Sequence, residues 1–330
     1  MSTTANDPAA RMAERLSSPI PASASNDESK KPGFWTTFKS MPLLVKLSFI
    51  WLVLIFGGAI YAKLDVSLFD GALPLQDPNL QTNNFNPATG AFGDGEPIEA
   101  PSGMHWLGTD AIARDTFSRV LHGAWVSLIV AMTAAACGIF IGGFVGSLVG
   151  FVRGRTETIA MATLDVILAF PALILLLALV SIFKVRDLFL ISAVIGFLSI
   201  PTYTRVARAG SLAISQREFV AAARAIGTKP RQILFREVIP NVMPTVLAYA
   251  MVQAAFVIVV EGTLSFLGLS VQLPQSSWGN MINQARRDIK ITEGFYQVLW
   301  PSIALTVTVL SLNQVGDWFQ RRRAVRSAAL

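Results

Sequence analysis

The sequence predicts an all-α membrane protein with several spanning helices, and both its composition and its long apolar runs indicate this class. Hydrophobic residues make up 52% of the 330 residues and charged residues only 15%, which is too apolar for one soluble domain. Several apolar runs are long enough to cross the roughly 30 Å of hydrocarbon in a bilayer. The placement of lysine and arginine around these runs then gives the expected orientation.

Six segments have the length and the apolarity of membrane-spanning helices. The expected spans are residues 43–62, 123–152, 157–183, 188–208, 241–267 and 297–319. No signal peptide is expected, because the first apolar run begins near Pro42 and is long enough to span the bilayer.

The spans divide the chain into five parts. Residues 1–35 are rich in Ser, Ala, Pro, Asp and Lys, and we expect a disordered cytoplasmic tail because they hold too few apolar residues to fold. The remaining parts are a first transmembrane helix in 36–62, an extracytoplasmic loop with a short helix in 63–122, a transmembrane core in 123–320 and a basic cytoplasmic tail in 321–330.

Basic residues concentrate on one side of the predicted membrane. Most of the 27 lysines and arginines lie on the side of the amino terminus, including Arg153 and Arg155 in a short loop and those of residues 216–240. By the positive-inside rule, both termini are expected in the cytoplasm. The net charge of +6 then reflects orientation, and no basic and aromatic pattern indicates nucleic-acid binding.

The second span carries a glycine at every fourth position. These residues fall on one helical stripe: Gly138, Gly142, Gly146 and Gly150. Stripes of small residues let another helix approach closely, so we expect helix packing here, with a pore-lining role as the alternative. Leucine at Gly142 should separate the two helices.

The third span contains a carboxylate, Asp165, followed by the pair Phe170-Pro171. A charged group in a span needs a partner or water. Asp165 is therefore either paired with a neighbouring helix or placed, with Phe170 and Pro171, along a translocation path. Pro171 should kink the helix just beyond it. Glu261 in the fifth span is expected near the outer end, closer to water.

Residues 216–240 form a charged segment between two apolar runs and predict two short helices joined at Gly227. A glycine there can adopt the left-handed conformation that ends a helix, and Pro230 suits the first turn of the next one. The predicted apolar faces are Phe219, Ala222, Ala223 and Ile226 in the first helix and Ile233, Leu234 and Val238 in the second. Exposed basic side chains are expected at Arg224, Lys229, Arg231 and Arg236. Such a platform suits a soluble partner; the alternative is an ordinary loop.

The end of the loop before the second span holds alternating acidic and basic residues. Thr109 or Asp110 can cap a short helix there, with Ile112, Thr116, Arg119 and Val120 at helical spacing. These residues form no set of nucleophile, base and orienting group, so no catalytic site is expected.

The sequence gives little support for a metal site, a disulfide or a nucleotide-binding site. His105 and His122 lack further ligands at metal-binding spacing, and Cys137 has no second cysteine to pair with. The chain contains no G-x-x-x-x-G-K-[ST] loop for nucleotide phosphates. If the protein uses ATP, another subunit must bind it.

Several motifs together resemble the permeases of ABC importers, of the dipeptide and oligopeptide type. The platform is similar to their coupling loop at Glu218, Ala222, Ala223, Gly227, Ile239 and Pro240, with Ala221 where glutamate is usual. The outer loop resembles their G-T-D-x-x-G-R-D-x-x-S-R signature at Gly108, Thr109, Asp110, Arg114, Asp115, Ser118 and Arg119, with Ala113 where glycine is usual. Phe170-Pro171, residues 264–269, residues 274–279 and Gly316-Asp317 fit the same family, and the resemblance covers about 105–320.

The resemblance implies the fold of a type I importer permease in the cell membrane of a prokaryote. It also implies four kinds of partner: a second homologous permease, two ATPase subunits that hold ATP and Mg²⁺, an extracytoplasmic solute-binding protein and the lipid bilayer. The chain itself would be a transport subunit and no enzyme, without a cofactor of its own. ATPase closure would move residues 218–240 and thereby open the path.

Two alternatives stay open. Permeases of the same family also serve importers of nickel, glutathione or opines. A passive channel is the alternative from a different class, although it would have no use for a coupling platform.

Overall fold

The computed structural model describes residues 38–68, 77–79, 81, 85–86, 91–92, 97–183, 187–271, 275–286 and 294–328. The chain divides into two compact units, Met1–Pro42 and Leu43–Leu330, and the second contains the helices discussed below. The expected tail of residues 1–35 lies outside the described residues, as does much of the outer loop between 69 and 96.

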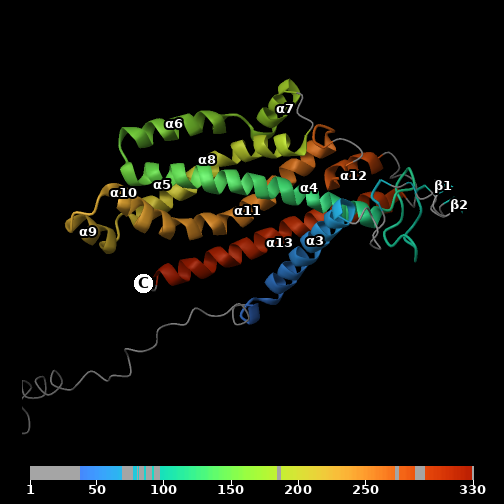
Figure 1. Cartoon of the computed structure of the whole chain (residues 1–330), viewed down its shortest axis with the longest axis horizontal. Coiled ribbons are helices and arrows are strands. Elements are labelled where there is room, and N and C mark those ends of the chain that lie inside the picture. The colour runs from blue at the N-terminus through green and yellow to red at the C-terminus, as the bar shows by residue number, and fades with distance from the viewer. Residues whose placement is uncertain are drawn as a thin grey trace, which may run out of the picture. The chain divides into compact units, whose positions relative to one another are not determined.

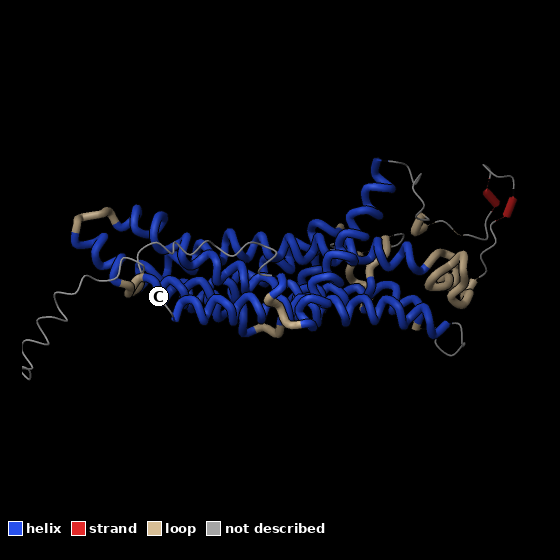
Figure 2. Tube along the Cα trace, turned by 90° about the horizontal axis from the view of Figure 1, so that it is seen from below, coloured by secondary structure: helices blue, strands red, loops and turns tan. Residues whose placement is uncertain are grey.

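Most of the larger helices of the second unit run side by side, whereas α7 (Ala172–Phe183) is turned away from them (Figures 1 and 2). The larger helices are α3 (Leu43–Leu68), α4 (Thr116–Cys137), α5 (Gly143–Val152), α6 (Arg155–Ala169), α7, α8 (Leu188–Ile214), α11 (Ile239–Phe266) and α13 (Gly294–Ala328). The shorter elements are α9 (Glu218–Ala225), α10 (Pro230–Ile233), α12 (Trp278–Ala285), the π-helical turns η2 (Gly138–Gly142) and η3 (Leu234–Val238), and the strands β1 (Phe85–Asn86) and β2 (Ala91–Phe92). The two strands pair antiparallel, with Phe85 opposite Phe92.

The predicted all-α membrane fold is confirmed. Among the described residues, five helical segments are long and apolar enough to cross a bilayer: Leu43–Leu64, Thr116–Val152, Leu188–Ile214, Pro230–Phe266 and Gly294–Arg322. The pair α6 and α7 gives a sixth if the two helices are counted as one span. The second and fourth of these segments begin seven or more residues before the predicted boundaries, because each continues an apolar run with helix from a flanking loop.

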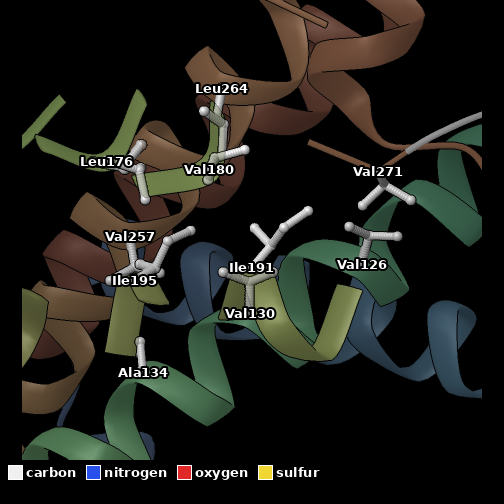
Figure 3. Close-up of a cluster of buried hydrophobic side chains, with 11 residues drawn as sticks. Val126, Val130, Ala134, Leu176, Val180, Ile191, Ile195, Val257, Leu264 and Val271 are labelled. Atoms are coloured by element: carbon white, nitrogen blue, oxygen red, sulfur yellow. The ribbon is translucent and has the colours of Figure 1, made fainter. Parts of the chain in front are cut away.

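Apolar side chains from four helices meet in one core (Figure 3). The buried members come from α4, α7, α8, α11 and the turn after α11: Val126, Val130, Ala134, Leu176, Val180, Ile191, Ile195, Val257, Val260, Leu264 and Val271. β-branched residues dominate this set, and their stiff side chains leave little rotamer freedom to lose on packing. The core thereby ties the short helix α7 to the longer α4, α8 and α11.

The glycine stripe packs directly on α8, as predicted. A Cβ atom at Gly142 would lie 2.8 Å from the carbonyl oxygen of Ile200, and one at Gly146 would lie 2.3 Å from that of Thr204. The same pattern continues to Gly150, whose Cβ would lie 2.7 Å from the carbonyl oxygen of Arg208. The stripe therefore sets the distance between α5 and α8, and it faces a helix rather than a path.

The third span is broken rather than kinked. α6 ends at Ala169, Phe170 has the extended angles φ −82° and ψ 134°, and α7 begins at Ala172 at 80° to α6. The predicted kink beyond Pro171 is thus wrong in kind. The ring of Pro171 disfavours helical angles at Phe170, and its missing N–H removes a helical hydrogen bond. The helix therefore stops before the proline and restarts after it.

Candidate functional site

The platform lies at one end of the bundle, beyond the ends of α5 and α8 (Figure 1). α9 ends at Ala225, and Gly227, the predicted junction of the two helices, has φ +79°. The Thr228 N–H donates to the Ala223 carbonyl at 3.1 Å, and the Gly227 N–H donates to the Arg224 carbonyl at 3.0 Å. This pair of bonds is the Schellman motif, which satisfies the last carbonyls of a helix through a left-handed residue. α10 then begins at Pro230, in its first turn as predicted.

Four buried apolar side chains attach the platform to the bundle. They are Val220, Ile233, Leu234 and Val238, and they pack with residues of α8 and α11 such as Tyr203 and Val246. The predicted apolar face of α10 and η3 is confirmed, but that of α9 is wrong. Phe219 is 42% exposed and Ile226 is 83% exposed, while the unpredicted Val220 is fully buried. In a helix of eight residues, two phases of the apolar pattern fit almost equally well, and only packing decides between them.

The outward side of the platform combines small, apolar and basic groups. Ala222, Phe219 and Ile226 are exposed beside Glu218, which lies in the first turn of α9. The four predicted basic residues, Arg224, Lys229, Arg231 and Arg236, are also exposed. The Arg224 guanidinium lies 5.6 Å from the centre of the Phe151 ring, which links α9 to the end of α5. The platform therefore contacts α5 as well as α8 and α11.

The helix does not end at Ile239-Pro240. Helical structure continues from Pro230 to Phe266, and the π-helical turn η3 lies directly before Ile239. Pro240 has no N–H to donate to the carbonyl four residues earlier, and its ring clashes with that carbonyl. A π-helical turn widens the helix at this point, a common device at functional sites. The platform is thus continuous with the fifth span.

Two ion pairs connect α6 with α8. Asp165 accepts a hydrogen bond from Arg205 Nη2 at 2.5 Å, and Glu157 accepts one from Arg208 Nε at 2.6 Å. The two acids are eight residues apart, about two turns, and so occupy one face of α6. Asp165 is therefore paired with a neighbouring helix. The Asp165 side chain is 57% exposed. Phe170 and Pro171, at the break between α6 and α7, are exposed as well.

Glu261 is not close to water, contrary to expectation. It is 1% exposed and accepts hydrogen bonds from Ser265 Oγ at 2.6 Å and Ser270 Oγ at 3.3 Å. The reason is α12, which the sequence did not predict. A Cβ at Gly279 would lie 2.1 Å from the carbonyl oxygen of Gly262, so α12 covers the end of α11 closely. A serine cap at Ser277, accepting from the Asn280 N–H, was the available signal for this helix.

The outer motif forms a tight turn at the opposite end of the bundle (Figure 1). Gly108 has φ +76°, and a Cβ there would lie 2.3 Å from the carbonyl oxygen of Glu99. The Glu99 N–H donates to the Thr109 hydroxyl at 2.9 Å, and the Thr109 N–H donates to the Glu99 carbonyl. Glycine is required at 108 because the chain passes so close to residue 99.

The short helix predicted from Thr109 or Asp110 is absent, and that expectation is wrong. α4 begins at Thr116, and Asp115 is its N-cap, accepting from the Ser118 N–H at 2.7 Å. His105 Nδ1 lies 3.2 Å from the second oxygen of Asp115. Asp110 cannot cap a helix because its carboxylate binds backbone and side chain of Arg114 instead.

The charged residues of the motif form one buried cluster. Arg114 donates to Asp110 through Nε at 2.7 Å, and Arg119 Nε lies 3.5 Å from the same carboxylate oxygen. Arg119 Nη1 also donates to the Pro78 carbonyl at 3.1 Å. Arg114 Nη2 donates to Gln284 of α12 at 3.0 Å. The cluster thus joins the motif to α12 and to a segment 41 residues earlier in the chain.

Ala113 occupies the one position at which this sequence departs from the signature. Its φ is +59° and it is fully buried, so the turn has left-handed angles, which glycine adopts without strain, at this position. Left-handed angles cost an L-residue other than glycine about 1–2 kcal/mol. The hydrogen bond from its N–H to the Asp110 carbonyl at 2.9 Å holds this geometry.

Comparison with known proteins identifies the architecture. Residues 138–326 match the family described as binding-protein-dependent transport system inner membrane component. The chain belongs to this family. A glutathione transport system permease protein of Pectobacterium atrosepticum is 36% identical over 219 residues, which cover 66% of this chain and 72% of that protein. A putative peptide permease protein of Brucella suis is 38% identical over 218 residues, with the same coverage.

The permease is therefore a multi-pass inner-membrane subunit of an ABC importer of the peptide and oligopeptide type. Its family is one of transporters and not an enzyme class. Within this permease, the structure brings the predicted platform residues together at one end of the bundle and the outer signature residues together at the other. Asp165, Phe170 and Pro171 lie between these ends, on α6 and its break.

Proposed function

We propose that the permease forms half of the translocation pore of an importer for peptide-like solutes, and that residues 216–240 receive an ATPase subunit. The observation that carries this is the platform: an exposed short helix whose turn is held by two backbone hydrogen bonds and whose base is buried through Val220. A rigid connection from that surface into α11 gives a partner's movement a direct route into the membrane helices.

Partners follow from what the chain lacks and what it exposes. The sequence contains no phosphate-binding loop, so ATP and Mg²⁺ would be held by two ATPase subunits, one for each permease. A second, homologous permease would cover the α6 and α7 face, where Phe170, Ile174 and the Asp165–Arg205 pair are exposed. A solute-binding protein would deliver solute at the end that carries the outer motif.

The substrate proposal rests on the relatives. One is named for glutathione transport and another as a putative peptide permease, and both names describe amide-linked amino acids. A dipeptide or oligopeptide is thus the first proposal, with glutathione second. Nickel and opines are alternatives that rest on family resemblance alone. A passive channel is disfavoured because it would not need the platform.

Reconstitution tests this function. The permease, its partner permease, both ATPases and the binding protein should together take up labelled dipeptides into liposomes in an ATP-dependent manner, and glutathione should compete if it shares the path. The permease alone should neither hydrolyse ATP nor transport. Uptake by the isolated chain would favour the channel, and ATP-dependent uptake of nickel without peptide uptake would contradict the peptide proposal.

The orientation can be tested by thiol labelling. In a Cys137→Ala background, Gln275→Cys should react with an impermeant maleimide in intact cells, and Lys229→Cys only after permeabilisation. Both positions are exposed, so accessibility reports the side of the membrane rather than burial. The positive-inside rule requires this order. Reaction of Lys229→Cys alone in intact cells would reverse the proposed topology.

A further inference from the structure

A cavity of about 490 Å³ opens beside the outer motif, between the start of α4, α12 and the start of α13. Its volume falls within the range of about 300–1,000 Å³ that is typical of small-molecule sites and far exceeds the space that one ion needs. The residues that matter for its chemistry are Asp110, Arg114, Thr116, Arg119, Gln284 and Gln297.

Among the residues that the structure describes, the charges on the cavity wall do not balance. Its charged lining residues are the carboxylate of Asp110 and the guanidinium groups of Arg114 and Arg119. Asp110 accepts from Arg114 Nε at 2.7 Å and lies 3.5 Å from Arg119 Nε, so one carboxylate serves two cations. Arg119 is 1% exposed, and arginine does not lose its charge in proteins. A buried cation without a full counter-charge is costly, which favours binding of one negative charge.

Hydrogen-bond donors at the wall also lack partners. Within the described part of the chain, three residues that line the cavity have a buried polar atom with no hydrogen-bond partner: Thr116 Oγ1, Arg119 Nη2 and Gln297 Nε2. All three can donate, and they come from α4 and α13, which are far apart in the sequence. Unsatisfied buried donors are uncommon in folded proteins. Water could satisfy the hydrogen bonds but not the charge.

We propose that this cavity binds a small organic molecule through one carboxylate group, with Arg119, Thr116 and Gln297 donating to its oxygens. Arginine is suited to a carboxylate because its planar fork can donate two parallel bonds. The remainder of the cavity would hold the body of the molecule. This site is on the permease itself and is tested by binding, so it stands apart from the transport proposed above.

The test uses the purified full-length chain in lipid nanodiscs and measures its thermal unfolding midpoint with two probes, N-acetyl-alanyl-alanine and its carboxyl-terminal amide. The acid should raise the midpoint with increasing concentration, because a ligand stabilises the state that binds it. The amide, which differs only in lacking the carboxylate, should bind at least tenfold more weakly. Equal effects of the two probes, or the same effect from sodium chloride at matched concentration, would overturn the proposal.

Variants of the donors locate the site. Gln297→Glu adds a carboxylate to the wall of the cavity that Arg119 also lines, so the unliganded midpoint should rise and binding of the acid should weaken at least tenfold. Thr116→Val removes one hydroxyl at nearly constant volume and should weaken binding about tenfold. Unchanged affinity in both variants would show that the acid binds elsewhere.

The other ligand that would offer a carboxylate to this cavity is an acidic side chain of a partner protein. If neither probe binds, while Gln297→Glu weakens docking of the solute-binding protein, the carboxylate belongs to an acidic side chain of that protein. That outcome overturns the proposal of a small solute.

Discussion

Gly227→Val should abolish most ATP-driven uptake by the assembled importer while leaving membrane insertion and ATP hydrolysis in place. Gly227 has φ +79°, and both hydrogen bonds of the Schellman turn depend on this angle. Left-handed angles cost an ordinary residue about 1–2 kcal/mol. A β-branched residue is a genuine outlier there. Since the turn orients α9, its loss should disconnect the ATPase surface from α11. The measurement compares uptake with ATP hydrolysis in proteoliposomes.

A matched variant separates conformation from bulk. Among the described residues, no heavy atom lies within 4 Å of a Cβ at Gly227, so any side chain has room. Gly227→Asn should therefore retain most of the coupled uptake, because asparagine tolerates left-handed angles. Ala222→Glu, on the exposed side of α9, should uncouple by placing a charge on the proposed contact surface. Full uptake in both the valine and the glutamate variant would contradict the coupling role.

Gly146→Ala should destabilise the permease strongly. The added Cβ would lie 2.3 Å from the Thr204 carbonyl oxygen, 2.8 Å from Ala207 Cβ and 3.0 Å from the Arg208 N. Two of these are backbone atoms, so α5 and α8 must move apart. Overpacking of this kind typically costs about 1–3 kcal/mol. Thermal unfolding in detergent, with the yield of monodisperse protein, measures the effect.

Gly143 provides the control on the same helix. A Cβ there would lie 3.6 Å from Val246 Cγ1, which is ordinary contact. Gly143→Ala should be neutral or should stabilise the helix by up to about 1 kcal/mol, because alanine is the better helix former. If Gly146→Ala unfolds at or above the wild-type midpoint, the stripe does not set the helix separation.

Some features follow from the sequence because their causes are local. The number of spans follows from apolar runs compared with the thickness of a bilayer. The turn at Gly227 follows from a glycine that precedes α10, a helix with Lys229 as its N-cap and Pro230 in its first turn. The stripe of Gly138, Gly142, Gly146 and Gly150 follows from helical periodicity and from the absence of side chains. Each of these depends on residues within one continuous stretch of the chain.

Other features were decided only when distant segments packed together. The buried face of α9 is that of Val220 because α8 and α11 offer an apolar surface there, and eight residues do not specify the phase. Asp165 pairs with Arg205, which is 40 residues away in the chain. Glu261 is shielded from water because α12 covers it. The Asp110 carboxylate pairs with two arginines instead of capping a helix, and α4 begins only at Thr116. Local patterns determined the apolar spans, the turn at Gly227 and the glycine stripe, whereas pairing of charges and burial of polar groups depend on contacts between residues that the sequence does not place side by side.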